Sequence, residues 1–279
     1  MAILSQLIVY PIKSCAGITV PAARVERAGL SVDGVRDREW MLVDPAGRFL
    51  TQREHPRMAL IVPRLIDGAV EVSAPGLAPF ALTTALGAAA TRQVTLWDDS
   101  VAALDCGDAA ALWFSAALGA ACRLVRLPPA PRQGSTRWTG GLANPVTFSD
   151  GYPLLLIGAA SLADLNDKLA AAGRAPLPMD RFRPNLVVDG LAAFEEDYAA
   201  SLSAGALRFK PVKPCPRCPI PSVDQRTGVP GPNPLDILQA YRAKPQLDGA
   251  ICFGMNCLLT EGEGALLTVG AEVEVELSF

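Results

Sequence analysis

The chain has 279 residues, of which 50% are hydrophobic and 19% are charged, and its formal net charge is −3. This share of hydrophobic residues is enough for a packed core, which excludes a wholly disordered chain. The weakly acidic balance provides no basic face for neutralising phosphates, so we expect no nucleic-acid binding.

The N-terminal part of the chain is predicted to be all β. Short β-prone runs alternate with Pro, Ser and Gly over 2–26, and two apolar runs flank a turn at 44–47. Further strands are predicted at 59–65, 69–74 and 92–97. Strands at this spacing are typical of a small barrel or sandwich.

The first helical pattern marks a predicted domain boundary. A helix is predicted at 108–119, with Asp108 as its N-cap and Gly119 at its exit. Because this helix follows the all-β part, we divide the chain into a first domain at 1–105 and a second domain at 106–279.

The second domain mixes strands with helices, so the expected fold class is α+β and β-rich. Ser161 is predicted to cap one helix, with Asp164 at the capping-box position. Leu162, Leu165 and Leu169 fall on one face of that helix, which predicts their burial. The predicted elements are, in order, a strand at 153–158, a helix at 161–173, a strand at 185–190, a strand leading into a loop at 207–224, a helix at 233–243 and a hairpin at 264–278.

The counts of cysteine and histidine indicate the cellular compartment and limit which metal sites the chain can form. The seven cysteines are an odd number, and no signal peptide or apolar stretch of about 18 residues accompanies them. We therefore expect a cytoplasmic protein with no membrane contact and no disulfide framework. His55 is the only histidine, which excludes His-rich zinc sites and two-His iron sites. A transition metal is expected to bind mainly through sulfur.

The C-P-R-C motif at 215–218 is the sharpest chemical feature of the sequence. Arg217 lies between its two cysteines, and a neighbouring cation favours the reactive thiolate form. Three alternatives remain open: a pair of ordinary buried cysteines, a redox pair without the usual βαβ surroundings, and a metal site. In the last, Cys252 and Cys257 would complete a four-thiolate zinc site or an iron–sulfur cluster.

Basic side chains at the ends of predicted strands form a second group. Lys13 and Ser14 follow the first strand, and Arg38, Arg53 and Arg183 also lie in turns. Such residues are commonly solvated surface groups, but loops at strand ends often carry ligand contacts. A convergent cluster would suit a compact anion such as a phosphate. No Gly-rich phosphate loop of the G-x-x-x-x-G-K-[ST] type is present.

Six segments form a pattern that spans nearly the whole chain. They are YPIKSCAG at 10–17, RDREWMLVD at 36–44, TQREHPRMALI at 51–61, RFRPNLVV at 181–188, RCPIPSVDQRTG at 217–228 and FGMN at 253–256. Together they resemble the MOSC proteins of the two-domain type, which include amidoxime-reducing oxidoreductases. The resemblance implies an N-terminal β-barrel domain followed by a MOSC β-barrel domain with flanking helices.

The resemblance also implies a molybdenum cofactor, Mo-molybdopterin, between the two domains. Cys218 matches the cysteine that binds the metal, and it is the implied catalytic residue. Gly151 and Tyr152 stand where relatives have Thr-Ser, which is a departure of this chain from the family pattern. The implied cofactor-binding residues are Lys13, Ser14, Arg38, Asp150, Gly151, Tyr152, Arg183, Asn185, Arg217 and Cys218.

The function implied by the resemblance is that of a molybdenum-dependent oxidoreductase. It would reduce N-hydroxylated small molecules such as amidoximes and hydroxylamines. Because the sequence contains no C-terminal ferredoxin-like cysteine run, we expect electrons from a separate donor protein of the ferredoxin, flavodoxin or cytochrome type. The alternative is a sulfur-transfer or molybdenum-cofactor carrier module that uses a persulfide on Cys218.

Overall fold

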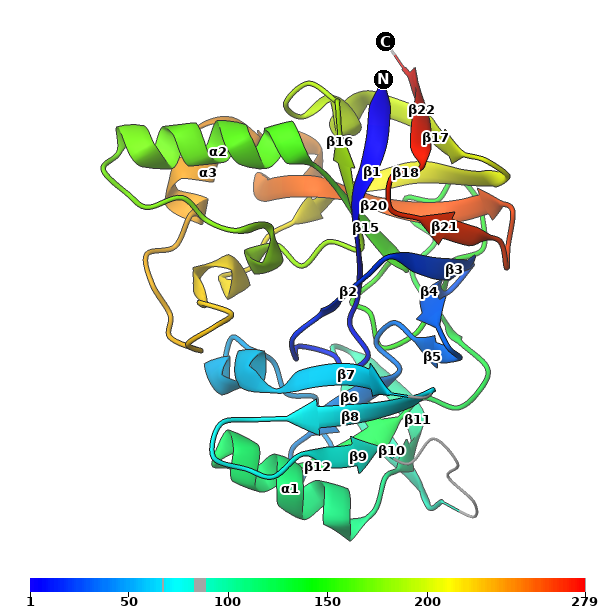
Figure 1. Cartoon of the computed structure of the whole chain (residues 1–279), viewed down its shortest axis with the longest axis vertical. Helices are drawn as coiled ribbons and strands as arrows, with labels where there is room; N and C mark the ends of the chain where they lie inside the picture. The colour runs from blue at the N-terminus through cyan, green and yellow to red at the C-terminus, as the bar shows by residue number, and fades with distance from the viewer. Residues whose placement is uncertain (67, 83–88, 279) are drawn as a thin grey trace.

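A closed barrel of seven strands forms the upper half of the molecule in Figure 1. The computed structural model describes residues 1–66, 68–82 and 89–278. Around the barrel each strand pairs with the next, and the last pairs with the first. The strands are, in this order, β15 (Leu154–Gly158), β16 (Leu186–Asp189), β1 (Ala2–Val9), β22 (Glu272–Leu277), β17 (Ala199–Ala204), β18 (Leu207–Pro216) and β20 (Ala250–Glu261).

The barrel joins the two ends of the chain. β1 pairs with β16 and with β22, and Ala2 is the register partner of Val273. The termini therefore lie side by side in Figure 1. Leu7 and Val9 of β1 pack in the same buried cluster as Leu156 of β15. The first strand thus belongs to a barrel made mainly from the second half of the sequence, and a domain division at 105 stays a prediction.

The lower part of Figure 1 contains two smaller sheets and a helix, and a third small sheet lies beside the barrel. The helix α1 (Asp108–Leu118) packs Phe114 into a buried cluster that also contains Trp40. The strands of the three sheets are β10 (Thr91–Leu96), β11 (Asp99–Asp105), β12 (Arg123–Arg126) and β6 (Trp40–Val43); β7 (Val62–Ile66), β8 (Ala69–Ser73) and β9 (Phe80–Leu82); and β21 (Leu266–Thr268), β3 (Ala22–Glu26), β4 (Gly29–Val32) and β5 (Val35–Arg36). The β-rich α+β class expected from the sequence is confirmed.

Short elements complete the chain. Strand β2 pairs with β1, β19 pairs with β20, and β13 pairs with β14. Their bounds are Ile18–Val20 for β2, Ala243–Lys244 for β19, Arg132–Gln133 for β13 and Pro145–Val146 for β14. None of the described helices is long and apolar enough to cross a membrane.

The helices form where the sequence predicts them, but two caps differ. Gly107 is the N-cap of α1 in place of Asp108, while Gly119 ends the helix with φ 72° as predicted. The helix α2 (Ala159–Ala171) has Gly158 as its N-cap, three residues before the predicted cap Ser161. Ser161 therefore does not cap α2, because its hydroxyl is buried and donates to Glu196 at 2.7 Å.

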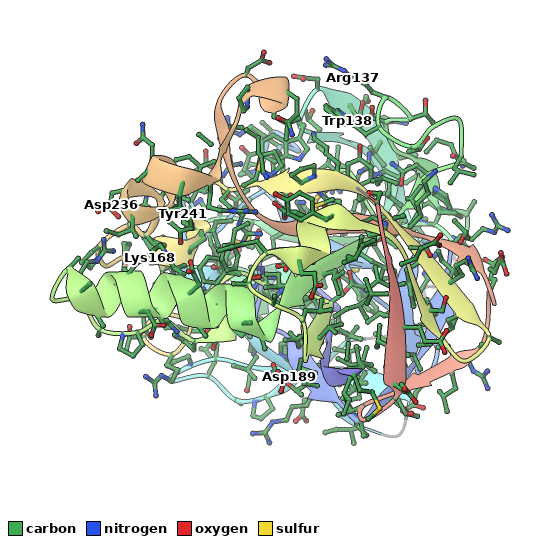
Figure 2. The ribbon with its side chains drawn as sticks, turned by 90° about the horizontal axis from the view of Figure 1, so that it is seen from above. Arg137, Trp138, Lys168, Asp189, Asp236 and Tyr241 are labelled. Atoms are coloured by element: carbon green, nitrogen blue, oxygen red, sulfur yellow. The ribbon has the colours of Figure 1, made fainter. Side chains whose placement is uncertain are left out.

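The apolar face predicted for α2 is confirmed. Leu162, Leu165 and Leu169 are buried on the face of α2 that packs against the barrel. Asp164 forms no capping box and instead pairs with Lys168 one turn later. The neighbouring helix α3 (Leu235–Arg242) lies beside α2 in Figure 2, where Tyr241 approaches Lys168 with its ring centre 4.7 Å from Nζ.

Two strand predictions need correction. The segment predicted as a strand at 59–65 begins as the 3₁₀ helix η1 (Pro56–Leu60), because proline suits the first turn of a helix. The predicted hairpin at 264–278 does not form, since β21 pairs with β3 and β22 pairs with β17 and β1. In the second case the partner strands come from distant parts of the chain, which periodicity does not reveal.

Candidate functional site

One open cleft collects all the residues that the sequence predicts for the site. Its empty volume is about 780 Å³, within the range of small-molecule and cofactor sites. The turns after β1 and β5 meet there with the segments 149–155, 182–185 and 215–220. The predicted residues on its wall are Lys13, Ser14, Arg38, Asp150, Gly151, Tyr152, Arg183, Asn185, Arg217 and Cys218. Their roles toward a cofactor stay predictions.

Lys13 places an ammonium group in the cleft wall, although the residue is only 5% exposed. Its Nζ donates hydrogen bonds to the Phe148 carbonyl at 2.9 Å and to Asp150 Oδ1. Burial lowers the pKa of Lys13, and the Asp150 carboxylate opposes this shift. Because an ammonium has three N–H donors, one is left for a ligand in the cleft.

The buried ring of Tyr10 contacts two guanidinium groups. Arg38 Cζ lies 4.5 Å from the ring centre, and Arg183 Cζ lies 4.3 Å from it. The Tyr10 hydroxyl donates to the Pro184 carbonyl at 3.2 Å, and burial raises the pKa of Tyr10 to about 12. The side chain of Arg183 forms no ion pair or hydrogen bond with the described residues. A neutral ring thus holds two like charges together, which favours an anionic ligand.

A buried hydrogen-bond network fixes Arg38. Its Nη1 donates to Asp37 Oδ2 and, at 3.0 Å, to Asn185 Oδ1. Asn185 Nδ2 donates at 3.1 Å both to Asp37 Oδ1 and to the Ile8 carbonyl, and Asn185 Oδ1 also accepts from Leu155 N at 3.2 Å. Burial disfavours the charged guanidinium, but Asp37 outweighs this effect and raises the pKa of Arg38. Asn185 therefore orients Arg38, with its own amide group fully engaged.

Backbone strain is concentrated at the cleft. Seven non-glycine residues in the described ranges have positive φ, and three of them line this site. Their φ angles are 64° for Ser14, 49° for Arg38 and 56° for Arg183. Side chains rarely adopt this left-handed region, and strain of this kind tends to collect at functional sites.

Ser14, Gly151 and Tyr152 complete the wall of the cleft. The Ser14 carbonyl accepts from Gln52 Nε2 at 2.8 Å, while its hydroxyl has no hydrogen bond to any residue that the structure describes. The Gly151 carbonyl accepts from Asn144 Nδ2 at 2.8 Å. Burial raises the pKa of Tyr152, so its phenol is neutral near pH 7. Ser14 and Tyr152 therefore contribute hydroxyl groups to the lining of the cleft.

Cys218 keeps its sulfur without a protein partner. It follows β18 and precedes the 3₁₀ helix η4 (Ile220–Ser222), and its Sγ has no hydrogen bond within the described ranges. Arg217 donates from Nη1 to Cys215 Sγ at 3.4 Å and from Nη2 to the Phe182 carbonyl at 2.7 Å. Arg217 therefore contacts the sulfur of Cys215, and the Cys218 sulfur lines the cleft without a partner among the described residues.

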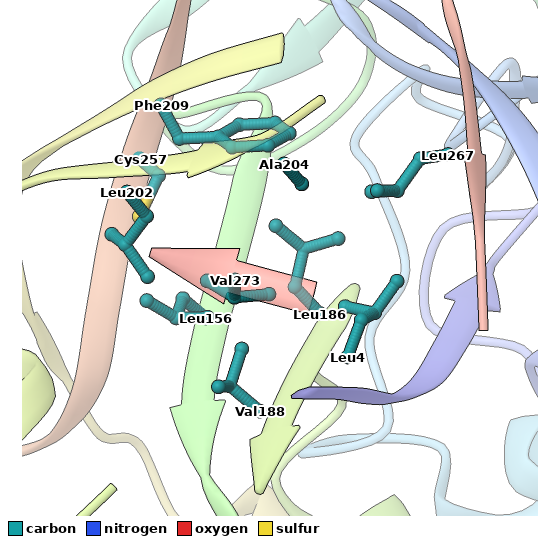
Figure 3. A pocket seen from close by; sticks show the side chains of 10 residues that line it. All are labelled: Leu4, Leu156, Leu186, Val188, Leu202, Ala204, Phe209, Cys257, Leu267 and Val273. Carbon is teal, nitrogen blue, oxygen red and sulfur yellow. The ribbon is translucent and has the colours of Figure 1, made fainter. Parts of the chain in front are cut away.

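The other cysteines do not complete a metal site. Cys257 lies inside the barrel among apolar side chains such as Leu156 and Phe209, as Figure 3 shows. Cys252 is fully buried, and burial raises its pKa to about 11. Across the described residues, no group of three or more His, Cys, Asp or Glu side chains could hold a metal ion. The four-thiolate alternative is therefore wrong.

The sequence reasoning missed three residues of the site. Tyr10 and Asp37 hold the arginines, and Ser149 lines the cleft with a buried hydroxyl that has no hydrogen-bond partner among the described residues. Tyr10 and Asp37 belong to the same segments as Lys13 and Arg38, which was the one available signal. Their contacts with Arg183 and Asn185 depend on residues far away in the chain.

Comparison with protein families matches both halves of this arrangement. The MOSC N-terminal beta barrel domain matches residues 1–121, and the MOSC domain matches residues 143–274. The chain belongs to the MOSC family. The resemblance inferred from the sequence motifs is thereby confirmed.

Two groups of relatives resemble this MOSC protein. Mitochondrial amidoxime reducing component 2 of Rattus norvegicus is 36% identical over 247 residues, covering 86% of this chain and 72% of the relative. Mitochondrial amidoxime-reducing component 1 of Homo sapiens is 33% identical over 248 residues, with the same coverage. Molybdenum cofactor sulfurase of Drosophila grimshawi is 34% identical over 242 residues, covering 83% of this chain and 29% of the sulfurase.

Proposed function

We propose that this MOSC protein is a molybdenum-cofactor-dependent oxidoreductase that reduces N-hydroxylated compounds such as amidoximes and hydroxylamines. The cleft carries the proposal, because it combines the unpartnered Cys218 sulfur with the cations of Lys13, Arg38 and Arg183. The similarity to the amidoxime reducing components supports the same substrate class.

The side chains of the cleft fit an anionic cofactor whose metal is bound through sulfur. Thiolates are ligands for soft, sulfur-rich metal centres, and Cys218 supplies one. Ammonium and guanidinium groups bind phosphates, and the cleft contains both. The buried hydroxyl of Ser149 lacks a partner in the described part of the chain, and a bound group would provide one.

Each residue then has a definite task. Cys218 would bind the metal of Mo-molybdopterin, and Lys13, Arg38 and Arg183 would hold its phosphate and pterin. When bound, the cofactor would supply two electrons for cleavage of the N–O bond of the substrate. Two protons complete the balance, so an amidoxime yields an amidine and the oxygen leaves as water. Asn185 keeps the Arg38 guanidinium in place throughout.

The cleft is open, which allows a small substrate to enter from solvent. We propose that a separate protein of the ferredoxin, flavodoxin or cytochrome type delivers the electrons. The proposed substrate follows the names of the relatives, and the proposed donor follows only the family resemblance of the sequence motifs. Both require that the half-buried Cys218 sulfur can be approached from solvent.

A second candidate function is sulfur transfer or cofactor carriage. The similarity to molybdenum cofactor sulfurase over 83% of this chain favours it, and the unpartnered sulfur of Cys218 suits a persulfide. In that case the protein would carry a sulfur atom or release the cofactor, and it would not turn over N-hydroxylated compounds.

Metal content and turnover separate these candidates. We would express the wild type, Cys218→Ala and the control Cys252→Ala in cells that make molybdopterin, and measure metals by plasma mass spectrometry. We expect near-stoichiometric molybdenum in the wild type and the control, and a large loss in Cys218→Ala. Reduction of an aryl amidoxime with a reduced viologen dye should follow the metal content. Molybdenum without turnover would favour the carrier, and a wild type that binds zinc or iron instead would refute the proposal.

A further inference from the structure

Trp97 occupies a strained position at the edge of the cleft. It lies in the turn of the β10–β11 hairpin, where Leu96 pairs with Asp99, and its φ is 56°. Hairpin turns that need positive φ favour Gly, Asn or Asp, so a tryptophan is unfavourable there. The residue is also 43% exposed. Neither turn geometry nor core packing explains this side chain at this position.

Two contacts fix the orientation of the Trp97 indole. The ring of Phe49 packs against it at 4.9 Å between ring centres, with an interplanar angle of 56°. Arg53 places its Cζ 4.6 Å from the indole centre, and its Nε bonds to Thr51 Oγ1 at 3.3 Å. The indole is therefore held from the protein side, although it is half exposed.

The Trp97 N–H bonds to a residue of the cleft. Nε1 donates to Asp150 Oδ1 at 3.2 Å, and the same oxygen accepts from Lys13 Nζ. The second carboxylate oxygen, Oδ2, accepts no hydrogen bond from the described residues, and the Asp150 side chain is 70% exposed. Trp97 and Lys13 thus hold one oxygen and leave the other available at the cleft.

The surrounding charges keep Asp150 ionised. Partial desolvation at the cleft wall would raise the pKa of Asp150, but the charge of Lys13, the hydrogen bonds from Lys13 and Trp97, and the charge of Arg38 lower it overall. Arg132 also interacts electrostatically with Asp150. At neutral pH the exposed oxygen is therefore a carboxylate oxygen, which accepts hydrogen bonds but cannot donate one.

We propose that Trp97 is a positioning residue that presents Asp150 Oδ2 as an acceptor for the N–H or O–H group of the substrate. This inference rests on the proposed function and names the feature that the site selects, a hydrogen-bond donor beside the N–O bond. Amidoximes and hydroxylamines carry such donors, whereas tertiary-amine N-oxides carry none. Asp150 then contacts the substrate, and Trp97 acts through Asp150.

A fluorescence titration tests the Trp97–Asp150 contact without any turnover. Protonation of Asp150 removes a negative charge beside the indole, so the emission of Trp97 should change with pH. The matched control is Trp113→Phe, because Trp113 Nε1 donates to the Ala78 carbonyl at 2.8 Å and Trp113 does not line the cleft. We would titrate the full chain as purified, together with Trp97→Phe and Asp150→Asn.

We expect an acid transition with its midpoint below the usual aspartate value of about 4 in the wild type and in Trp113→Phe. The transition should disappear in Trp97→Phe and in Asp150→Asn. A transition that persists in either of these variants would overturn the positioning role. Circular dichroism of each variant shows whether the fold is retained.

Substrate selectivity tests the second part of the proposal. A hydrogen bond to a charged group contributes about 1.5–3 kcal/mol, so Asp150→Asn should raise KM for an amidoxime about ten- to a hundredfold. Trp97→Phe should raise it about three- to tenfold, with a smaller change in kcat and no change for a tertiary-amine N-oxide. Equal effects on both substrates would contradict the inference. Absence of all turnover in the wild type would overturn the proposed function and the substrate role of Asp150, while the titration would still decide the role of Trp97.

Discussion

Replacing Tyr10 tests how the cations of the cleft are held. Arg38 and Arg183 lie 4.5 and 4.3 Å from the ring centre, and each cation–π contact contributes about 0.5–2 kcal/mol. The hydroxyl bond to the Pro184 carbonyl adds about 1 kcal/mol. Tyr10→Leu should therefore lower the free energy of unfolding by about 2–5 kcal/mol. Tyr10→Phe keeps the ring and should cost only about 1 kcal/mol.

Urea denaturation followed by circular dichroism measures both variants. Because leucine also leaves unfilled space, a double-mutant cycle with Arg183→Gln isolates the ring–guanidinium contact. We expect a coupling energy of about 1 kcal/mol between Tyr10→Leu and Arg183→Gln. Because phenylalanine keeps the ring, the coupling between Tyr10→Phe and Arg183→Gln should be zero within experimental error. Equal costs for Leu and Phe at position 10, or a Leu cycle without coupling, would refute the idea that the ring holds the cations.

Three other changes have defined outcomes. Burial alone would raise the pKa of Asp105, but hydrogen bonds, with that from Arg123 the largest, lower it to about 2. Since the unfolded value is about 3.9, this carboxylate stabilises the fold above pH ~4, so Asp105→Asn should cost about 2 kcal/mol at pH 7 and progressively less toward pH 2 in urea denaturation. Gly254 has φ 80°, and an added Cβ would lie 2.7 Å from the Leu156 carbonyl oxygen, so Gly254→Ala should lower the thermal midpoint through a loss of about 2 kcal/mol or more. Pyrophosphate at 100 times its Kd should stabilise the wild type by about 2.7 kcal/mol, and this shift should shrink strongly in Arg183→Gln.

Residues close together in the chain were predicted well. Lys13 and Ser14 follow a strand and a proline, and Cys218 lies in a Pro-rich loop, so local sequence places each at the end of an element. The buried face of α2 followed from the helical spacing of its leucines. These features depend on neighbours within a few positions, which periodicity and turn chemistry describe.

Residues that act through distant partners were missed or misassigned. Ser161 carries the signature of a helix cap, yet its hydroxyl bonds to Glu196, which is 35 positions away. Trp97 was predicted as the last residue of a strand at 92–97, but β10 ends at Leu96. Trp97 lies in the hairpin turn, and its N–H reaches Asp150, 53 positions further along the chain. A cap or a turn is a local preference of about 1 kcal/mol, and buried polar groups that need partners override it.

By itself, the sequence determined the chemical character of this protein: a β-rich chain with a C-P-R-C motif and with cations at the ends of strands. The motifs were sufficient for the family because they specify residue types at short spacing. Only the tertiary structure decided that β1 closes the barrel with β16 and β22, and that Cys257 faces its interior while Cys218 faces the cleft. The free energy of the whole fold selects these partners, because it depends on how much apolar surface is buried and on whether every buried polar group is hydrogen-bonded. A short stretch of sequence does not determine either quantity.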